Sequence, residues 1–496
     1  MTAAVDPVVL VAVPLVASVL PVAAGGVTDR LAWLIAAAAL ALQAALAAVV
    51  CASALFAAPV RSVVGGVPEP FGIALVVDPL SAPFVVLTAA TGLGVLVYAR
   101  RTGPRSDPFW SLALLLVAGI TGVAVTADLF NLYVFLEISG LASYALVAAA
   151  DGGEAALAAL KYLLLGTVGA SLYLLGVGYA YVGTGTLSMA ALAPALAAGG
   201  GLGGTVPAVA FGLMAVGLGV KAAVFPLHVW KPDAYAAAPP AVAGLLSALV
   251  STVAAYAVLR LLLSAFTVDL LAAVTLLEGA LLAVGVASVA AGSLLAFREP
   301  DVRRLLAYSS VSQFGIVTVG LALATPAALV GVVIHLLGHA VTKGGFYLAA
   351  GSVARADGAR TVDDYAGLAG RAPLLSVAVA VFALGLVGIP PTVGFAGKLY
   401  VLLGAVEGTA PVAAAVVLAS TLASLAYFGR LLQRVFVESA TAGSAGHATP
   451  ETDGGSDRPS AGALAVVLLA ALVTVLLGLG AAAVADLVAP ALRGVA

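Results

Sequence analysis

The chain has 496 residues, of which 63% are hydrophobic and only 9% are charged. Soluble domains carry about 25% charged residues, so this composition excludes a soluble globular protein. The formal net charge of −2 gives no reason to expect a nucleic-acid partner. The single cysteine, Cys51, excludes an internal disulfide and cysteine-based iron–sulfur or zinc sites.

Apolar segments long enough to cross a bilayer, about 20 residues each, recur along the whole chain. We expect fourteen of them, over residues 6–24, 31–57, 73–98, 109–126, 128–150, 158–182, 206–228, 240–263, 270–296, 304–324, 327–352, 374–404, 410–433 and 461–489. No Lys/Arg-rich segment precedes the first, so we interpret it as a spanning helix and not as a cleaved signal. The pattern predicts an all-α membrane protein with about 14 transmembrane helices.

The distribution of positive charge predicts an orientation. Most of the 21 Lys and Arg residues fall in every second connection between the predicted spans. The positive-inside rule places those connections in the cytoplasm and both termini outside, in a multi-pass protein of the cell membrane. Residues 436–460 are rich in Ser, Gly, Thr and Asp, which predicts a flexible cytoplasmic loop.

Glycine and proline interrupt the seventh and twelfth predicted spans, at residues 217–226 and 388–398. Such breaks persist in a bilayer only where protein or a water-filled cavity satisfies the freed backbone groups. Each break carries one lysine, and the two lie five spans apart, as expected of two structural repeats that each hold a discontinuous helix near a transport site. The predicted organisation is helices 1–3 (1–108), a first repeat (109–265), a second repeat (266–435), the loop (436–460) and a C-terminal helix (461–496).

Ionisable side chains inside the spans are the candidates for chemistry, because each costs at least ~2.5–3.5 kcal/mol to bury at mid-membrane. Glu137 lies near the middle of the fifth span. A glutamate that faces a buried lysine can take up and release a proton as that lysine changes state, although a static ion pair is the alternative. Lys221, just before Pro226, is a candidate proton carrier, with snorkelling to the interface as the alternative.

The eleventh span carries His335, His339 and Lys343 at spacings of four residues, which places them on one helix face. Imidazole titrates near neutral pH and suits a proton relay. Two histidines at this spacing can also bind zinc. Because Leu336 stands where a metalloprotease has its glutamate, and because a lysine continues the face, we favour the relay. Lys398, at the end of the second break, is a further candidate carrier.

Three other side chains leave open alternatives. Glu278, in the ninth span, fits function and interface exposure equally well. We expect Arg260 to snorkel at a helix end. Tyr308 begins a polar run that suits either a wet path or polar packing between helices. The sequence contains no phosphate-binding loop and no nucleotide fingerprint, so we expect a transporter subunit that needs no cofactor or metal of its own.

Several segments resemble the large antiporter-like subunits shared by respiratory complex I, membrane-bound hydrogenases and Mrp-type multisubunit Na⁺/H⁺ antiporters. The resemblance covers about residues 75–435. It is carried by the motif Asp-Leu-Phe-Asn-Leu-Tyr-Val-Phe-Leu-Glu at 128–137 and its continuation to 144, and by residues 161–169, 221–235, 237–240, 301–310, 335–343 and 388–398.

The resemblance implies two inverted five-helix repeats, broken helices 7 and 12, a central polar axis and partner subunits in the same membrane. Glu137 and Lys221 match the key couple of the family. Lys398 and the His and Lys residues of the eleventh span match its second half-channel. His228, inside the 221–235 motif, is a secondary candidate.

This sequence departs from the family at the connection between the half-channels. Relatives usually carry a bridging lysine in the eighth span, and Thr252 stands there instead. Lys231 replaces an apolar residue of the family motif, and Tyr235 replaces a common histidine. The resemblance therefore provides no lysine at the position that usually links the two half-channels.

Three hypotheses follow for function. The motif at 128–137 and the chain length look most like the D-type member of Mrp-type antiporters, so the leading one is a proton-translocating subunit of a monovalent cation (Na⁺)/H⁺ antiporter. The alternative is a proton-pumping subunit of a redox complex of complex I or hydrogenase type. A third is a scaffold that conducts nothing. No compact acidic cluster within the spans identifies the cation.

Overall fold

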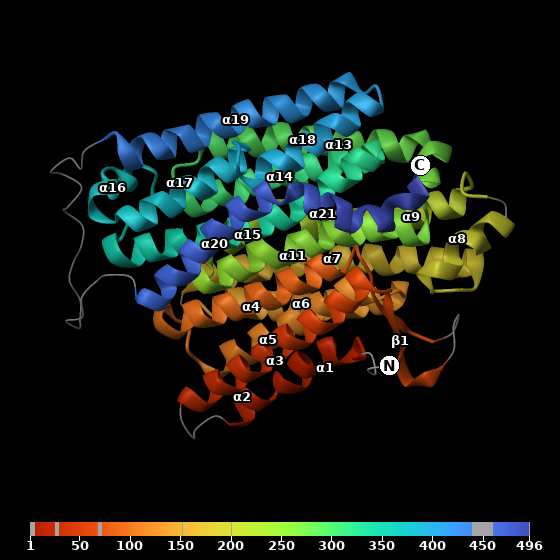
Figure 1. The fold of residues 1–496 in the computed structure, drawn as a ribbon, viewed down its shortest axis with the longest axis horizontal. Helices are drawn as coiled ribbons and strands as arrows, with labels where there is room; N and C mark the ends of the chain where they lie inside the picture. The colour runs from red at the N-terminus through yellow and green to blue at the C-terminus, as the bar shows by residue number, and fades with distance from the viewer. Residues whose placement is uncertain are drawn as a thin grey trace.

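A computed structural model describes residues 5–24, 29–67, 72–150, 152–199, 201–438 and 460–495. Its helices lie side by side along the long axis of the molecule (Figure 1). Twelve of them are long and apolar enough to cross a membrane. Apart from the N-terminal region and the broken spans described below, the long helices are α5 (Asp107–Val125), α6 (Leu129–Ala148), α7 (Gly153–Thr184), α11 (Pro240–Arg260), α13 (Thr275–Arg298), α14 (Val302–Leu323), α15 (Pro326–Asp357), α19 (Pro411–Phe436) and α20 (Ala461–Leu479).

Shorter apolar helices supply the remaining predicted spans, which confirms an all-α membrane fold. α1 (Val8–Ala17) and α2 (Leu20–Ala23) together form the first span. The other short elements are α8 (Met189–Ala198), α12 (Asp269–Ala273), α16 (Leu368–Arg371), α21 (Ala481–Val488), the π-helical segment η2 (Leu261–Ala265) and the 3₁₀ helices η1 (Val64–Gly66), η3 (Asp363–Tyr365) and η4 (Ala489–Val495).

The third predicted span, 73–98, begins too early. Residues 74–77 form strand β2, which pairs antiparallel with β1 (Val60–Val63). This hairpin joins α3 (Asp29–Phe56) to α4 (Ala82–Thr102). A short apolar run fits a strand as well as a helix end. Pairing with β1 satisfies the backbone hydrogen-bonding groups of β2. A scan of the sequence for hydrophobicity does not detect this partner strand.

The seventh span is interrupted as predicted. α9 (Thr205–Ala222) ends at Ala223, whose φ of 61° is left-handed, and a short helix, α10 (Lys231–Ala237), follows after a turn. Side chains satisfy part of the freed backbone: the Trp230 indole donates to the Val220 carbonyl at 2.9 Å.

The twelfth span is interrupted in the same way. α17 (Pro373–Val387) stops at Gly388, with a φ of 88°, and α18 (Val393–Glu407) begins after two prolines. The predictions 206–228 and 374–404 therefore each cover a break in an otherwise helical segment.

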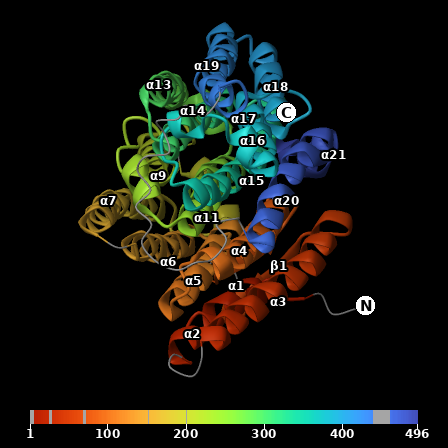
Figure 2. The same cartoon turned by 90° about the vertical axis from the view of Figure 1, so that its left-hand side faces the viewer.

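The centre of the molecule is formed by α11, α14 and α15, which are almost wholly buried. α11 packs against α9, α4 and α15, and α15 packs in turn against α17 and α18, so α11 and α15 together connect the two broken segments (Figure 2). Outer helices such as α7, α13 and α20 have less than half of their residues buried and carry large apolar side chains outward. Such a surface suits contact with lipid or with partner helices.

The proposed domain boundaries remain predictions. Most of the predicted loop 436–460 lies outside the described residues, because the structure describes nothing between Glu438 and Ser460.

Candidate functional site

The first cluster of ionisable groups forms between α6 and α9. The Lys221 Nζ lies 3.7 Å from the Glu137 Oε1, within ion-pair range but beyond a hydrogen bond. It donates to the Leu136 carbonyl and to the Tyr144 hydroxyl, both at 3.3 Å. Lys221 is only 2% exposed, so its amine stays inside the protein and does not reach the interface.

The absence of a side chain at Gly140 leaves space for the Lys221 amine. A Cβ added to Gly140 would lie 2.6 Å from the Lys221 Nζ and 3.0 Å from the Tyr144 hydroxyl. Lys221 itself sits in the last turn before the helix break, and its own carbonyl accepts from the Ser251 hydroxyl of α11 at 3.1 Å. The break therefore places a buried amine on a backbone that neighbouring side chains hold in position.

The second cluster lies on the buried face of α15. Lys343 is fully buried, and its Nζ donates to the Leu306 carbonyl at 2.7 Å and to the Ser309 hydroxyl, both on α14. His335 and His339 are nearly as buried, and their ring nitrogens have no hydrogen-bond partner in the described part of the chain. Unpartnered imidazoles inside a protein are able to accept or pass on a proton.

Lys398 completes this second cluster in the first turns after the other break. Its Nζ donates to the carbonyls of Val387, at 2.9 Å, and Leu386, at 3.4 Å, and to the Thr421 hydroxyl of α19 at 3.4 Å. α18 packs closely on α15, because a Cβ on Gly397 would lie 2.9 Å from the Nδ1 of His335. Lys221 and Lys398 thus both lie beside a break, but only Lys221 has an acid as neighbour among the described residues.

The secondary candidates divide between buried and exposed positions. His228 is buried, and its ring lies 5.5 Å from that of Phe225 and 6.2 Å from that of the half-buried Tyr308. Thr252 is fully buried, and its hydroxyl has no partner among the described residues. Glu278 lies exposed in the first turn of α13, apart from both clusters.

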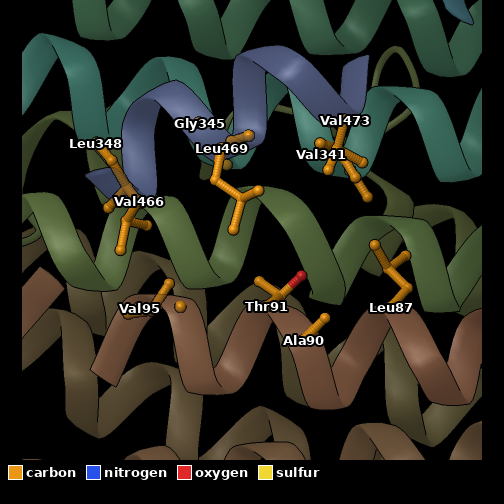
Figure 3. A pocket seen from close by; sticks show the side chains of 14 residues that line it. Leu87, Ala90, Thr91, Val95, Val341, Gly345, Leu348, Val466, Leu469 and Val473 are labelled. Carbon is orange, nitrogen blue, oxygen red and sulfur yellow. The ribbon is translucent and has the colours of Figure 1, made fainter. Parts of the chain in front are cut away.

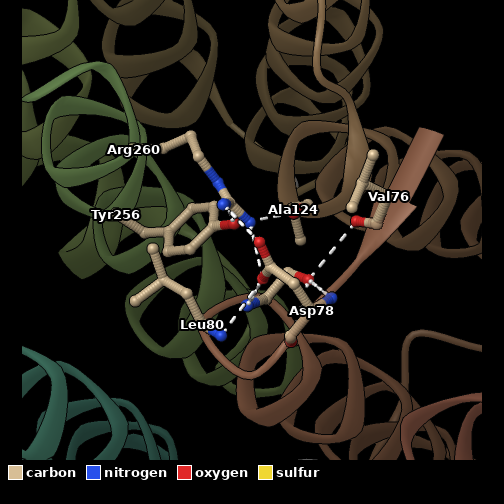
Figure 4. Close-up of polar contacts among 7 residues, drawn as sticks. Val76, Asp78, Leu80, Ala124, Tyr256 and Arg260 are labelled. Atoms are coloured by element: carbon tan, nitrogen blue, oxygen red, sulfur yellow. Dashed lines mark hydrogen bonds and ion pairs between the residues drawn. The ribbon is translucent and has the colours of Figure 1, made fainter. Parts of the chain in front are cut away.

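Arg260 does not snorkel. Its guanidinium binds the Asp78 carboxylate through two bonds, of 2.6 and 2.9 Å, and also donates to the Tyr256 hydroxyl at 3.1 Å (Figure 4). Asp78 follows β2, so this pair joins the N-terminal hairpin to the end of α11. The expectation failed because the partner lies 182 residues away in the chain.

An apolar cavity of about 150 Å³ lies between α4, α15 and α20 (Figure 3). Thr91 contributes the only side-chain hydroxyl among its lining residues. An ion or proton path needs polar groups, so this cavity is separate from the two clusters. Across the described ranges, no three His, Cys, Asp or Glu side chains come together as a metal site.

Sequence reasoning gave no role to Tyr144, Ser251 and Lys231, which the structure places in or beside the first cluster. Tyr144 stands seven residues after Glu137, two helical turns along the same face, and this spacing was available as a signal. Ser251 carries no comparable signal, since its contact with the Lys221 carbonyl depends on how α11 packs against α9.

Ionisable side chains buried beside two interrupted membrane helices define an ion-translocating type of multi-pass membrane protein. The family described as "NADH:quinone oxidoreductase/Mrp antiporter, TM" matches residues 126–424. The chain therefore belongs to this family of antiporter-like membrane subunits.

Similar proteins occur in both branches of the family. The chain is 42% identical to NADH-quinone oxidoreductase subunit N of Desulforudis audaxviator, over 77% of this chain and 76% of that protein. It is 32% identical to the D-type member of the Na(+)/H(+) antiporter of Bacillus subtilis, over 72% of each chain. A chain in the structure of the Mrp complex from Dietzia superposes with a TM-score of 0.89 at 28% identity, covering 100% of this chain and 98% of that one.

Proposed function

We propose that this chain translocates protons as one membrane subunit of a larger complex, and that Glu137 and Lys221 carry the first transfer. The supporting observation is the buried Lys221 amine, 3.7 Å from the Glu137 carboxylate and directly before a helix break. An ionised carboxylate at this distance favours the ammonium form of the lysine. When a proton neutralises Glu137 that attraction disappears, and Lys221 releases its own proton more readily.

The second cluster continues the path in this proposal. Lys343 and Lys398 are held by carbonyl and hydroxyl oxygens, which remain satisfactory neighbours for either the charged or the neutral amine. His335 and His339 lie on the same helix face as Lys343, and their free ring nitrogens suit a relay. We favour relay over metal binding for the two histidines.

We propose that the complex is redox-driven, of the NADH-quinone oxidoreductase type. The motif at 128–137 favours a Mrp-type antiporter, but over the larger part of the chain the identity is 42% to a quinone oxidoreductase subunit N and 32% to the D-type antiporter protein. Cation/proton antiport, with Na⁺ as the expected cation, is the second candidate. The close superposition on a chain of a Mrp complex supports it.

The proposed setting is the cell membrane, with both chain ends outside and other integral-membrane subunits as partners. The positive-inside distribution of Lys and Arg supports this orientation. The apolar side chains that α7, α13 and α20 expose provide surface for neighbouring subunits or lipid.

Inverted membrane vesicles that contain the complete complex test both parts of the proposal. A pH-sensitive dye reports acidification of the vesicle lumen after addition of NADH and a short-chain quinone, and separately the collapse of an imposed pH gradient by Na⁺, K⁺ or Li⁺. Redox-driven acidification supports the first candidate, whereas gradient collapse by a cation without redox substrate supports the second.

The variant Glu137→Gln tests the site in whichever assay responds. We expect it to reduce translocation at least ~10-fold, the scale of a lost acid–base group. The exposed Glu407 in the last turn of α18 provides the matched control, and Glu407→Gln should leave translocation unchanged. Normal translocation by Glu137→Gln would contradict the proposed role and favour the scaffold hypothesis.

A further inference from the structure

Lys231 is a buried cation that has no counter-ion among the residues that the structure describes. It opens α10, directly after the first helix break, and its side chain is 0% exposed. In the described ranges no carboxylate pairs with it, and its Nζ makes one hydrogen bond, to the Ser251 hydroxyl at 2.9 Å. Burying an ammonium group with so little compensation is costly. This energetic cost makes Lys231 a candidate for a functional role.

On one side, Lys231 adjoins the first cluster. The Ser251 hydroxyl that accepts from Lys231 donates in turn to the Lys221 carbonyl at 3.1 Å. The neighbouring Trp230 stacks on Tyr162 with ring centroids 3.9 Å apart, and Tyr162 packs edge-on against Tyr144 at 4.5 Å. The Tyr144 hydroxyl accepts from the Lys221 amine, so a continuous set of contacts joins the two lysines.

On the other side, Lys231 faces the second cluster. Its Nζ lies 4.7 Å from the centroid of the Phe314 ring on α14. That ring packs edge-on against the imidazole of His339, with centroids 4.8 Å apart. Lys231 also lies within electrostatic range of His339 and Lys343. Lys231 therefore lies between the two groups of ionisable side chains.

We propose that Lys231 is a proton carrier that connects the two clusters, an inference that rests on the proposed function. In one transfer an N–H bond of its ammonium breaks, and the proton passes to the imidazole of His339 or the neutral amine of Lys343. The neutral Lys231 then accepts a proton from the Lys221 side, and its ammonium is restored. The unpartnered Thr252 hydroxyl, next to Ser251 in the chain, adds a polar group to this buried region.

Two substitutions at position 231 separate proton transfer from a requirement for positive charge. Methionine has an unbranched side chain of similar length and cannot carry a proton, and removing an uncompensated buried charge should not impair folding. Arginine keeps the charge and the donors but does not release its proton. We expect Lys231→Met and Lys231→Arg both to reduce translocation by the complete complex in vesicles at least ~10-fold.

The measurement is the initial rate of acidification or gradient collapse per amount of assembled complex, which native gel electrophoresis of the same vesicles provides. Arg298→Met, at the exposed end of α13, is the matched control and should translocate normally. A normal rate in Lys231→Met would overturn the proposal, and an active Lys231→Arg would show that only a charge is needed.

Glu137→Gln, measured in parallel, separates this proposal from the function on which it rests. If Glu137→Gln is inactive and Lys231→Met is normal, the connecting role of Lys231 fails and the proposed function stands. If both variants are normal, the proposed function fails as well.

Discussion

Two regions of the molecule each join a buried base to a half-buried carboxylate, and their geometries differ. At the end of α11, Arg260 and Asp78 are joined by two short bonds, and Tyr256 and Ser81 add further hydrogen bonds. Beside the first helix break, one long contact of 3.7 Å joins Lys221 to Glu137, and that glutamate oxygen has no hydrogen-bond partner in the described structure.

The difference separates a structural clamp from a transfer site. Arginine does not lose its proton in proteins, and its planar fork matches a carboxylate. Burial raises the pKa of Asp78, but the charge and hydrogen bonds of Arg260 and the hydrogen bonds from Ser81 lower it by more. The net pKa is therefore below its ordinary value, and the carboxyl stays ionised. Lysine can lose its proton, and a loosely connected pair can change protonation with little loss of structure.

Asp78→Ala should give the largest loss of stability, because it leaves the Arg260 guanidinium buried without its partner. We expect a cost of about 3–5 kcal/mol in the free energy of unfolding. Thermal unfolding and yield of the purified complex measure it. The double variant with Arg260→Met should recover most of the loss, whereas an equally unstable double variant would contradict a clamp role.

Exchange of the two basic side chains should have opposite consequences in the two regions. Lys221→Arg keeps the charge but cannot release a proton, so we expect translocation to fall at least ~10-fold in an assembled complex. Arg260→Lys loses the two-bond geometry, so we expect lower stability but near-normal translocation per assembled complex. If Lys221→Arg translocates protons normally, the Lys221–Glu137 pair has a structural role like that of the Arg260–Asp78 pair and does not transfer protons.

Gly140→Ala should weaken transfer by crowding the Lys221 amine, since the new Cβ would lie 2.6 Å from the Nζ. We expect a several-fold loss of translocation and a destabilisation of about 1–3 kcal/mol from overpacking. Gly178→Ala in α7 is the control, because no atom lies within 4 Å of its new Cβ. Equal effects of the two variants would show that helix propensity, not the crowding of Lys221, is responsible.

The smallest effect is expected at a partly exposed pair of contacts outside the spans. Asp233 accepts from Lys161 and from Arg304, each at 2.8 Å. Burial raises its pKa, but these two partners lower it more. Its stabilisation is therefore present above the unfolded pKa of about 3.9 and is lost as the pH falls through the lower folded value.

Asp233→Asn should cost about 0.2–1 kcal/mol per contact at pH 7. The difference from the unmodified complex should disappear in strongly acidic buffer, as followed by thermal unfolding from pH 7 downward. A difference that persists unchanged in acid would contradict the role of the charge at Asp233.

Much of this architecture could be predicted from the sequence. Span length and the Gly and Pro interruptions are local properties, so the all-helical membrane fold and the breaks beside Lys221 and Lys398 followed from composition and spacing. The same approach mistook the start of the third span for helix, since β2 depends on its partner strand β1.

The sequence by itself identified most of the ionisable groups that this protein buries, because a charged residue stands out within an apolar run. It did not identify Lys231, which is buried outside the predicted spans, or show that Glu278 is exposed. Only the tertiary structure decided which groups meet. The contact of Arg260 with Asp78 and the position of Lys231 between the two clusters depend on how α11 packs against α4, α9 and α15. The physical reason is that Coulomb and hydrogen-bond contacts act over a few ångströms in space, whatever the separation of their residues along the chain.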